Sequence, residues 1–386
     1  MPPQLVVGAA VVRHGTLLAA RRTHPPETAG RWELPGGKVE PGEDPGDAVV
    51  REVAEELGCA VVVRRWLDAE VEIRPGLVLR AAECRLVDDR SGGPVAAEHD
   101  RLTWLGPEEL GDVDWLEPDR PFLPALRETL LDGEVLAGGH VGGAVRVGAT
   151  VRRPVGPWTP AVHALLGHLA AAGLPHVPAV HGTDARGREV LDFLPGRVVD
   201  VDADELPDAR LAALGAWTAR LHAAVASFDH PGPWRFHGVD APRLVAHNDL
   251  APSNLVWDGD DLAGVLDWDL AGPSSPLLEL AHLAWHAVPL VRAAPGDPAH
   301  AARRLRLLAA SYGGGRHDGP GAREILDAVP GRVRLAIGGI RAASGRGDAQ
   351  MAAGMAAAGE PARTEAALAG LEARLPALRE ALASGA

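Results

Sequence analysis

The sequence predicts a multidomain α/β protein, and three observations carry that prediction. Its 386 residues exceed what one hydrophobic core usually serves, and 46% of them are apolar. Short strand patterns alternate with amphipathic helix patterns up to Leu270, and the pattern beyond is almost wholly helical. A cluster of glycines follows Asp132, so we predict two domains, at 1–132 and 133–386.

The first part combines short strands with two helices. Residues 4–12 form an apolar run typical of a buried strand, and a second strand is expected at 17–21. After a loop rich in proline and glycine, Asp44 is a candidate N-cap, Pro45 takes the first helical position, and Gly58 is expected to end the helix. The remaining elements expected are strands at 59–72, 76–87 and about 101–105, and a helix that ends near Leu131.

The second part is predicted to consist of a small lobe, at about 134–195, and a helical lobe, at about 200–386. Strand patterns dominate the small lobe, while a strongly periodic helix opens the helical lobe. The elements expected are strands at 144–153, 177–181 and 188–193, helices at 160–172 and 211–227, a hairpin within 244–270, helices from Ser275 onward, and an amphipathic tail helix at 361–383.

Composition and charge exclude several classes of protein. The formal net charge of -14 argues against stable nucleic acid binding, because phosphate backbones require a basic face. The two cysteines, Cys59 and Cys84, set no disulfide framework, which fits a reducing compartment. No apolar run approaches the ~18 residues of a membrane helix, and the N-terminus lacks the positive start of a signal peptide. We therefore expect a cytoplasmic protein without a membrane partner.

Three glutamates are stacked on one face of the helix predicted after Asp44. Glu52, Glu55 and Glu56 stand at positions i, i+3 and i+4, which places their carboxylates side by side. A solvated acidic face is the ordinary interpretation of such a cluster. Here a glycine turn precedes the helix and Arg51 lies beside the acids, so we favour a site for Mg²⁺ or Mn²⁺ that bridges to substrate phosphates.

The same segment resembles the signature of the Nudix family, in which a glycine and an acidic loop precede a helix with the pattern Arg-Glu-apolar-x-Glu-Glu-x-Gly. Cys59 stands where the family usually has a larger apolar residue. Segments 32–38 and 116–121 are similar to MutT-like members, and the resemblance covers about residues 4–130. It implies an α/β/α sandwich that hydrolyses nucleoside triphosphates to monophosphate and pyrophosphate. The matching positions are Gly37, Glu43, Arg51, Glu52, Val53, Glu55, Glu56 and Gly58.

The resemblance to MutT-like enzymes assigns roles to individual residues. Glu98 would be a further metal ligand or the base, Arg22 would contact phosphate, Lys38 would bind the substrate, and Asp119 would recognise the nucleobase. An oxidised purine nucleotide such as 8-oxo-dGTP is the substrate that the resemblance favours. The groups implied for metal binding and catalysis are Glu52, Glu55, Glu56, the carbonyl oxygen of Gly37, and Arg51 as the orienting cation.

A second polar constellation lies in the predicted hairpin. Two short strands pair across the turn at 258–261, which brings Asp249, Asn254 and Asp267 to one end. There one carboxylate can orient an attacking hydroxyl, while an amide oxygen and a second carboxylate hold Mg²⁺ on nucleotide phosphates. An acidic hairpin with a capping asparagine explains the turn but not the whole array.

The pattern His-x-Asp-x4-Asn, followed by a strand and Leu-Asp-x-Asp, resembles the aminoglycoside phosphotransferase and choline-kinase-like family. The resemblance covers about 134–386 and implies a bilobal protein-kinase-like α+β fold with a helical C-terminal lobe and ATP as co-substrate. Asp249 would be the catalytic base, Asn254 and Asp267 the magnesium ligands, and His247 a brace for the loop. The nucleotide-binding residues that it adds are Asp269 and the hinge residue Phe193.

Two features depart from that family. Its kinases place a strand lysine on the α and β phosphates and pair it with a helix glutamate, but the only lysine in this chain is Lys38. We expect Arg152 to take its place by charge, although the planar guanidinium requires a different phosphate geometry. No Asp or Glu occurs within 154–183, where the predicted helix offers His163 and His168 instead.

The sequence thus predicts two enzymes in one chain, a Mg²⁺-dependent pyrophosphohydrolase of nucleoside triphosphates and an ATP-dependent phosphotransferase of a small molecule. Small nucleotides are the expected partners. The alternative for the second domain is a pseudokinase that binds a nucleotide or metabolite and regulates the hydrolase. The phosphate acceptor stays open, and the candidates for lining its pocket are Glu279, His282 and His286.

Overall fold

The chain forms two compact units in the computed structural model. The first comprises Met1–Leu136 with Ala144–Arg152, and the second consists chiefly of Arg153–Ala386. The strands expected near 144–153 therefore belong mostly to the first unit, and the domain boundary near residue 132 stays a prediction. The structure describes residues 3–88, 93–136, 143–199, 205–236, 239, 241–288, 290, 296–314, 319–345 and 349–384.

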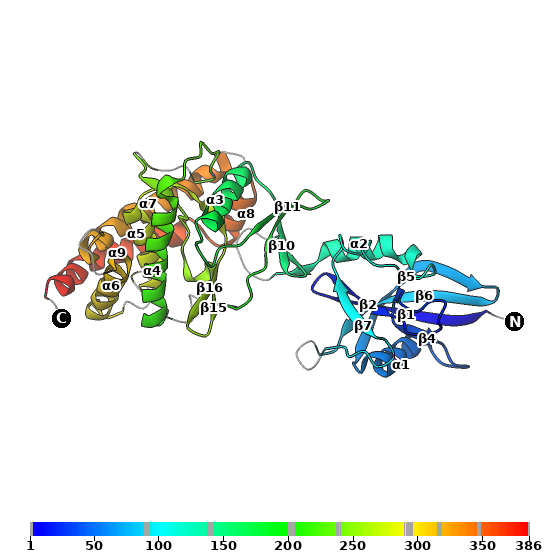
Figure 1. Cartoon of the computed structure of the whole chain (residues 1–386). Coiled ribbons are helices and arrows are strands. Elements are labelled where there is room, and N and C mark those ends of the chain that lie inside the picture. Colours follow the sequence, from blue (N-terminus) through cyan, green and yellow to red (C-terminus); the bar gives the residue numbers. More distant parts are fainter. Residues whose placement is uncertain are drawn as a thin grey trace. The chain divides into compact units, whose positions relative to one another are not determined.

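A seven-stranded sheet forms the centre of the first unit (Figure 1). Its strands are β1 (Gln4–Arg13), β2 (Thr16–Arg21), β3 (Trp32–Glu33), β4 (Gly36–Lys38), β5 (Val61–Arg74), β6 (Leu77–Leu86) and β7 (Arg101–Leu105). The order is β3-β2-β1-β6-β5, with β4 paired to β1 and β7 paired to β2. Strands β1 and β6 are parallel, and the other pairs are antiparallel.

Helices cover both faces of this sheet. Neighbouring residues of a strand point to opposite faces. Val7, Ala9 and Val11 of β1 accordingly pack in one apolar cluster with helix α1 (Pro45–Leu57), whereas Ala10 belongs to a second cluster with helix α2 (Leu123–Asp132). A short 3-10 turn, η1 (Arg120–Phe122), leads into α2. The predicted α/β/α sandwich is confirmed, with α1 and α2 on opposite sides in Figure 1.

Helix α1 begins and ends where its sequence predicts. The Asp44 side chain accepts a hydrogen bond from the N–H of Gly46, and Pro45 takes the first helical position. Gly58 adopts a left-handed φ of 63° and donates its N–H to the carbonyl oxygen of Ala54. The buried face consists of Ala48, Val49, Val53 and Leu57. Glu52, with 15% side-chain exposure, and the partly buried Glu56 lie beside it, and Glu55 is exposed.

Three short antiparallel strands follow the sandwich: β8 (Glu134–Val135), β9 (Val145–Val147) and β10 (Thr150–Arg153). The second unit begins with a small lobe made of α3 (Thr159–Ala171) and the hairpin of β11 (Val180–Thr183) and β12 (Glu189–Asp192). Its other short elements are β13 (Arg197–Val198), η2 (Val225–Ser227), β14 (Leu244–Ala246), η3 (Pro252–Asn254), β15 (Leu255–Asp258), β16 (Asp261–Val265), η4 (Trp268–Leu270) and β17 (Gly272–Ser274). The helices of the helical lobe are α4 (Asp208–Ala224), α5 (Pro276–Ala287), α6 (Pro298–Gly313), α7 (Ala322–Gly345), α8 (Ala349–Ala357) and α9 (Ala362–Ala383).

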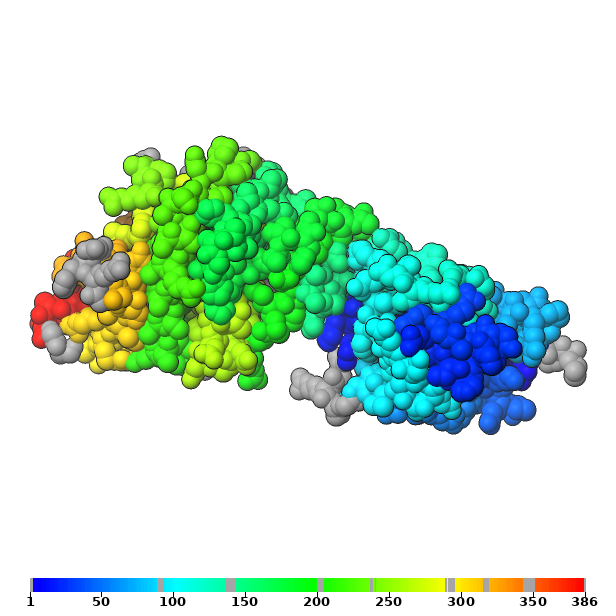
Figure 2. Space-filling model, in the orientation of Figure 1, coloured from blue at the N-terminus to red at the C-terminus, as the bar shows by residue number. Residues whose placement is uncertain are grey.

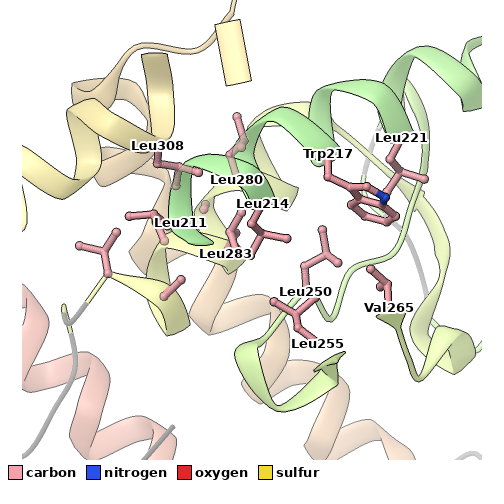
Figure 3. Close-up of a cluster of buried hydrophobic side chains, with 14 of the residues drawn as sticks. Leu211, Leu214, Trp217, Leu221, Leu250, Leu255, Val265, Leu280, Leu283 and Leu308 are labelled. Carbon is pink, nitrogen blue, oxygen red and sulfur yellow. The ribbon is translucent and has the colours of Figure 1, made fainter. Parts of the chain in front are cut away.

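One apolar cluster holds the helical lobe together, and Figure 3 shows its centre. Side chains spaced three or four residues apart on α4 face the loop before β15, the hairpin of β15 and β16, and helices α5 and α6. This packing fixes the hairpin against the helices. The residues labelled are Leu211, Leu214, Trp217, Leu221, Leu250, Leu255, Val265, Leu280, Leu283 and Leu308.

The last helices close the helical lobe. Helix α9 contacts both α6 and α7, and its red atoms lie beside yellow and orange ones in Figure 2. The predicted amphipathic tail helix is confirmed, because Leu368, Leu371 and Leu378 are buried. Within the stretches that the structure describes, no helix combines the length and apolar character needed to cross a bilayer.

Candidate active sites

Arg51 is the centre of the polar cluster on α1. Its Nε and Nη2 donate to the two carboxylate oxygens of Glu43 at 2.9 and 3.0 Å. Its Nη1 donates to Glu52 at 2.9 Å and to Glu55 at 3.4 Å, and Nη2 also reaches the carbonyl oxygen of Lys38 at 3.2 Å. The guanidinium offsets the repulsion among the acids, and its hydrogen bonds to Glu43 lower the pKa of that carboxyl to about 2.

Glu56 is held apart from this arginine network. It accepts a hydrogen bond from the N–H of Gly36 at 2.9 Å, and burial raises its pKa. Among the residues that the structure describes, no three His, Cys, Asp or Glu side chains converge closely enough to hold a metal ion as they stand. Glu52, Glu55 and Glu56 must therefore reorient to share one ion, since Arg51 binds the first two and Gly36 the third.

The turn before α1 nevertheless fits a divalent cation. A Cβ on residue 37 would collide with the carboxylate of Glu52, so only glycine leaves this space to the acid. Gly36, with a φ of 153°, pairs closely with Gly8 of β1 and fixes the turn against the sheet. Carboxylate and carbonyl oxygens are the ligands that Mg²⁺ and Mn²⁺ prefer. The donor set at this turn therefore fits either ion.

The loop before β7 places a histidine, rather than the expected acid, next to Glu56. Glu98 has an exposed side chain, and its carbonyl oxygen accepts a hydrogen bond from Thr23 at 3.1 Å. Its neighbour His99 is buried, with Nε2 3.2 Å from Oε1 of Glu33. Both His99 and Glu33 act electrostatically on Glu56. Neither was singled out from the sequence, although Glu33 lies in the segment 32–38; the role of Glu98 stays a prediction.

Two of the three residues expected to bind substrate lie around Glu33. Arg22 donates through Nη1 to Glu33, while Lys38 is exposed on β4. Asp119 is buried and accepts a hydrogen bond from the N–H of Leu34 at 3.4 Å. Burial raises the pKa of Asp119 to about 7. The structure thus brings Arg22 and Asp119 to Glu33 and Leu34, the segment that joins β3 to β4.

In the second unit, the hairpin brings its polar residues to one end. Leu255 pairs with Val265, so Asn254 and Asp267, which flank the two strands, lie at the same end. The side-chain amide of Asn254 donates to both the carboxylate and the carbonyl oxygen of Asp249 at 2.9 Å. Asp267 adopts a left-handed φ of 57°, a conformation that aspartate tolerates better than most residues.

Buried side chains brace the loop that carries Asp249. The Nε2 of His247 donates to the carbonyl oxygen of Leu266 at 2.9 Å, and its Nδ1 accepts from the N–H of Asp249 at 3.2 Å. Burial lowers the pKa of His247, which keeps this neutral tautomer. Asn248 is left-handed, with a φ of 64°, and its N–H lies 3.1 Å from both oxygens of Glu279. The brace expected of His247 is therefore present, and Glu279 adds to it.

The expected position of Arg152 requires a correction. Its Nη2 lies 3.3 Å from Oε2 of Glu108, within the first unit. The arginine of β10 that reaches the hairpin acids is Arg153, whose Nη2 lies 2.6 Å from Asp269 and 3.3 Å from Asp267. The reason is that adjacent residues of a strand point to opposite faces. Burial alone would lower the pKa of Arg153, but the neighbouring acids outweigh it and raise the pKa.

The acid that accompanies this arginine comes from a strand. Glu189 opens β12, and its carboxylate lies 3.3 Å from Nε of Arg153 and 2.9 Å from Nε2 of His163 on α3. The sequence did not indicate Glu189, because it lies beyond the stretch 154–183 in which the partner acid of the family is expected. Its place directly before the expected hinge was the signal that could have found it. Phe193, the hinge residue, follows β12 directly and is half-buried.

Of the three residues expected to line the acceptor pocket, two lie near Asp249 and the third supports the loop. His282 is buried, with Nε2 3.2 Å from Oδ1 of Asp249. Its ring centroid lies 4.7 Å from that of His286, so both histidines lie close to the expected catalytic base. Glu279, by contrast, binds the backbone of Asn248 and is fully buried, which makes it a support for the loop instead of a pocket wall.

Comparison with known proteins matches both units. The NUDIX domain matches residues 2–126, and the phosphotransferase enzyme family matches residues 157–241 and 233–318. The chain is 44% identical over 130 residues to the putative 8-oxo-dGTP diphosphatase 2 of Mycobacterium tuberculosis, covering 33% of this chain and 90% of that protein. It is 37% identical over 120 residues to the CTP pyrophosphohydrolase of Escherichia coli, with coverages of 31% and 88%. It is 34% identical over 192 residues to the trifolitoxin immunity protein of Rhizobium leguminosarum bv. trifolii, with coverages of 46% and 73%.

The fold and the two sites define an enzyme that combines a hydrolase domain with a kinase-like domain. The first site stands on a helix rich in glutamate, and the second at the end of a β-hairpin. The chain belongs to the Nudix family, and its C-terminal part carries a domain of the phosphotransferase enzyme family.

Proposed function

We propose that the first unit is a nucleoside triphosphate pyrophosphohydrolase that depends on Mg²⁺ or Mn²⁺. The observation that supports it most is the set of Glu52, Glu55 and Glu56 on one helix, beside a glycine that leaves space for a carboxylate. A divalent cation held by these acids and by the carbonyl oxygen of Gly37 would neutralise phosphate charge and lower the pKa of a bound water.

The other polar groups of this site orient the reactants. Arg51 holds Glu43 and, with it, the loop before α1, while Arg22 and Lys38 bind phosphate oxygens. Glu98 accepts the proton of the attacking water, or provides a further ligand. Oxygen of water bonds to phosphorus, the bond from that phosphorus to the bridging oxygen breaks, and nucleoside monophosphate and pyrophosphate leave.

We propose an oxidised purine nucleotide such as 8-oxo-dGTP as the substrate. Support comes from the relative named as an 8-oxo-dGTP diphosphatase, although another relative is named for CTP. Asp119 recognises the base edge in this proposal. With a pKa of about 7, its carboxyl either donates or accepts a hydrogen bond near neutral pH.

Release of pyrophosphate from a panel of triphosphates tests the proposal with the full chain. We expect turnover of 8-oxo-dGTP to require Mg²⁺ and to stop when a chelator is added. Glu55→Gln and Glu56→Gln are each expected to lower turnover by about a hundredfold, since both remove a carboxylate ligand. Asp68→Asn, which changes an exposed carboxylate on β5, is the matched control. Full turnover in both glutamine variants would refute the metal assignment.

For the second unit we propose ATP-dependent transfer of the γ-phosphoryl group to a hydroxyl of a small molecule. Asp249 accepts the proton of that hydroxyl, and Asn254 and Asp267 would hold the magnesium of the nucleotide. The bond from the γ-phosphorus to the bridging oxygen breaks, and ADP leaves. The hydrogen bond between Asn254 and Asp249 supports this assignment, as does the 28% exposure of the Asp249 side chain.

Two observations favour a second candidate, a kinase-like domain that binds a nucleotide or metabolite and regulates the hydrolase without catalysis. The only lysine of the chain, Lys38, lies in the first unit, and one relative is named as an immunity protein. The products formed from ATP distinguish the two candidates, measured in a full chain whose hydrolase site is inactivated by Glu56→Gln. Phosphotransfer yields ADP in a reaction that Asp249→Asn abolishes, whereas a binding domain takes up ATP and forms no ADP.

A further inference from the structure

Arg153, the last residue of β10, lies among three acids. Its Nη2 is 2.6 Å from Oδ1 of Asp269 and 3.3 Å from Oδ1 of Asp267, while its Nε is 3.3 Å from Oε1 of Glu189. The side chain of Arg153 is 19% exposed, so it is mostly covered but keeps an opening to solvent. One guanidinium thus stands between a buried acid and the expected magnesium ligand.

Glu189 holds this guanidinium from behind. Its side chain is only 3% exposed, and its two oxygens are divided between Nε of Arg153 and Nε2 of His163. A carboxylate buried to this degree needs charged or hydrogen-bonding partners, because desolvation of an unpaired charge is unfavourable. Strand β12 therefore supplies the acid for Arg153, and helix α3 supplies a histidine that orients that acid.

The two acids at the end of the hairpin differ in what they contact. Asp269 is engaged by two arginines, since its other oxygen lies 3.1 Å from Nη1 of Arg235. The guanidinium of Arg235 in turn lies 4.3 Å from the ring centroid of Trp158. Asp267 is 45% exposed, against 16% for Asp269, so it is the acid that a cation from solvent can reach.

We propose that Arg153 binds the nucleotide phosphates in the second unit, held by Glu189 and His163, and so replaces the lysine that this unit lacks. The inference rests on the proposed nucleotide binding of this unit. An arginine stays charged at every physiological pH, and it can keep a carboxylate on Nε while its terminal nitrogens bind phosphate oxygens. A phosphate bound to magnesium at Asp267 lies within reach, because the two side chains are 3.3 Å apart.

Calorimetric titration of the full chain with the magnesium complex of adenylyl imidodiphosphate, an ATP analogue, tests the proposal. The parent chain carries Glu52→Gln and Glu56→Gln, which silence the hydrolase site. Arg153→Met is expected to weaken binding about tenfold or more, as for loss of a charge-assisted hydrogen bond. Arg153→Lys is expected to restore most of the affinity. Adenosine, which has no phosphate, is expected to compete equally well in the parent and in Arg153→Met.

Arg188→Met is the matched control, because Arg188 is another paired arginine of the small lobe, 2.7 Å from Asp184. It is expected to bind as the parent does. An equal loss of adenosine and analogue binding in Arg153→Met would overturn the proposal, and so would a lysine variant no better than the methionine variant. If the parent binds the analogue and Arg153→Met binds it equally, only the role of Arg153 fails. If the parent binds neither ligand, nucleotide binding by the second unit fails as well.

Discussion

The carboxylate of Glu52 lies against the Cα of Gly37, in space that a side chain at residue 37 would fill. This contact joins α1 to β4 at the point where the metal is proposed to bind. The obstructing atoms are the flexible end of a glutamate, so an added methyl group displaces the acid without disturbing the backbone. At the preceding Gly36, a Cβ would instead collide with the carbonyl oxygen of Val7, which is backbone of β1.

Gly37→Ala is therefore expected to separate function from stability. The displaced Glu52 should weaken the apparent affinity for Mg²⁺ by about tenfold or more, while the free energy of unfolding changes by less than about 1 kcal/mol. Gly36→Ala is expected to lower the free energy of unfolding of the first unit, because the backbone of β4 or β1 must shift to accommodate the methyl group. Metal titration of pyrophosphate release, together with urea unfolding, measures both quantities. Equal destabilisation by the two substitutions would contradict this interpretation.

Removal of Arg51 is expected to change the titration of Glu43. Hydrogen bonds from Arg51 are the main cause of its low pKa, followed by the N–H of Glu40. In Arg51→Met we expect the pKa of Glu43 to rise from about 2 towards its ordinary value of 4.5. Carboxyl carbon NMR over an acid titration measures it, with Asp68→Asn as the control. A pKa of Glu43 that stays near 2 would show that Arg51 is not its cause.

Asp119 is expected to make the first unit less stable as the pH rises. Burial raises the pKa of this carboxyl from 3.8 to about 7, so between these values the folded state keeps a proton that the unfolded chain has lost. Stability therefore falls from about pH 4 to about pH 7 and is constant above, for a total on the order of 4 kcal/mol. Asp119→Asn removes this loss. Its gain in unfolding free energy over the parent should grow from about pH 4 to about pH 7 and then stay constant. If the unfolding free energies of the two proteins, measured with urea, change with pH in parallel, the raised pKa is wrong.

Substitution of Glu279 is expected to loosen the loop that carries Asp249 in the second unit. Both of its oxygens lie 3.1 Å from the N–H of Asn248, and burial raises its pKa to about 7. Glu279→Ala leaves that buried N–H without an acceptor and should cost about 2–4 kcal/mol. Glu279→Gln keeps an acceptor and resembles the protonated acid, so we expect a loss below about 2 kcal/mol. Urea unfolding measures the stability of both variants. A glutamine variant as unstable as the alanine variant would contradict the role of Glu279 as the acceptor for the N–H of Asn248.

Local features of the fold could be predicted from the sequence because their causes lie within a few residues. The helix from Pro45 to Leu57 follows from an N-cap, a proline at the first position and a glycine at the end. The hairpin that joins Asn254 to Asp267 follows from two apolar runs around a short turn. The family signatures are segments of the same kind, so the sequence alone suffices to recognise both domains.

The sequence could not decide which of two adjacent residues on a strand faces a site. Arg153 reaches the hairpin acids, although Arg152 was expected there. The role of Glu98 stays a prediction. Neighbouring side chains in extended backbone point in opposite directions. Choosing between them requires the register against other strands, and that register depends on contacts far along the chain.

The sequence by itself determined the longer helices and strands, the two families and the places of the glutamates on α1 and of the polar hairpin residues, because periodicity, capping and motif spacing are local properties. Only the tertiary structure decided which charges meet: Glu189 with Arg153 and His163, and Asp119 with the segment around Glu33. The reason is physical. A buried charge is stable only beside a partner, and packing of distant elements, not their order in the chain, brings the partner to it.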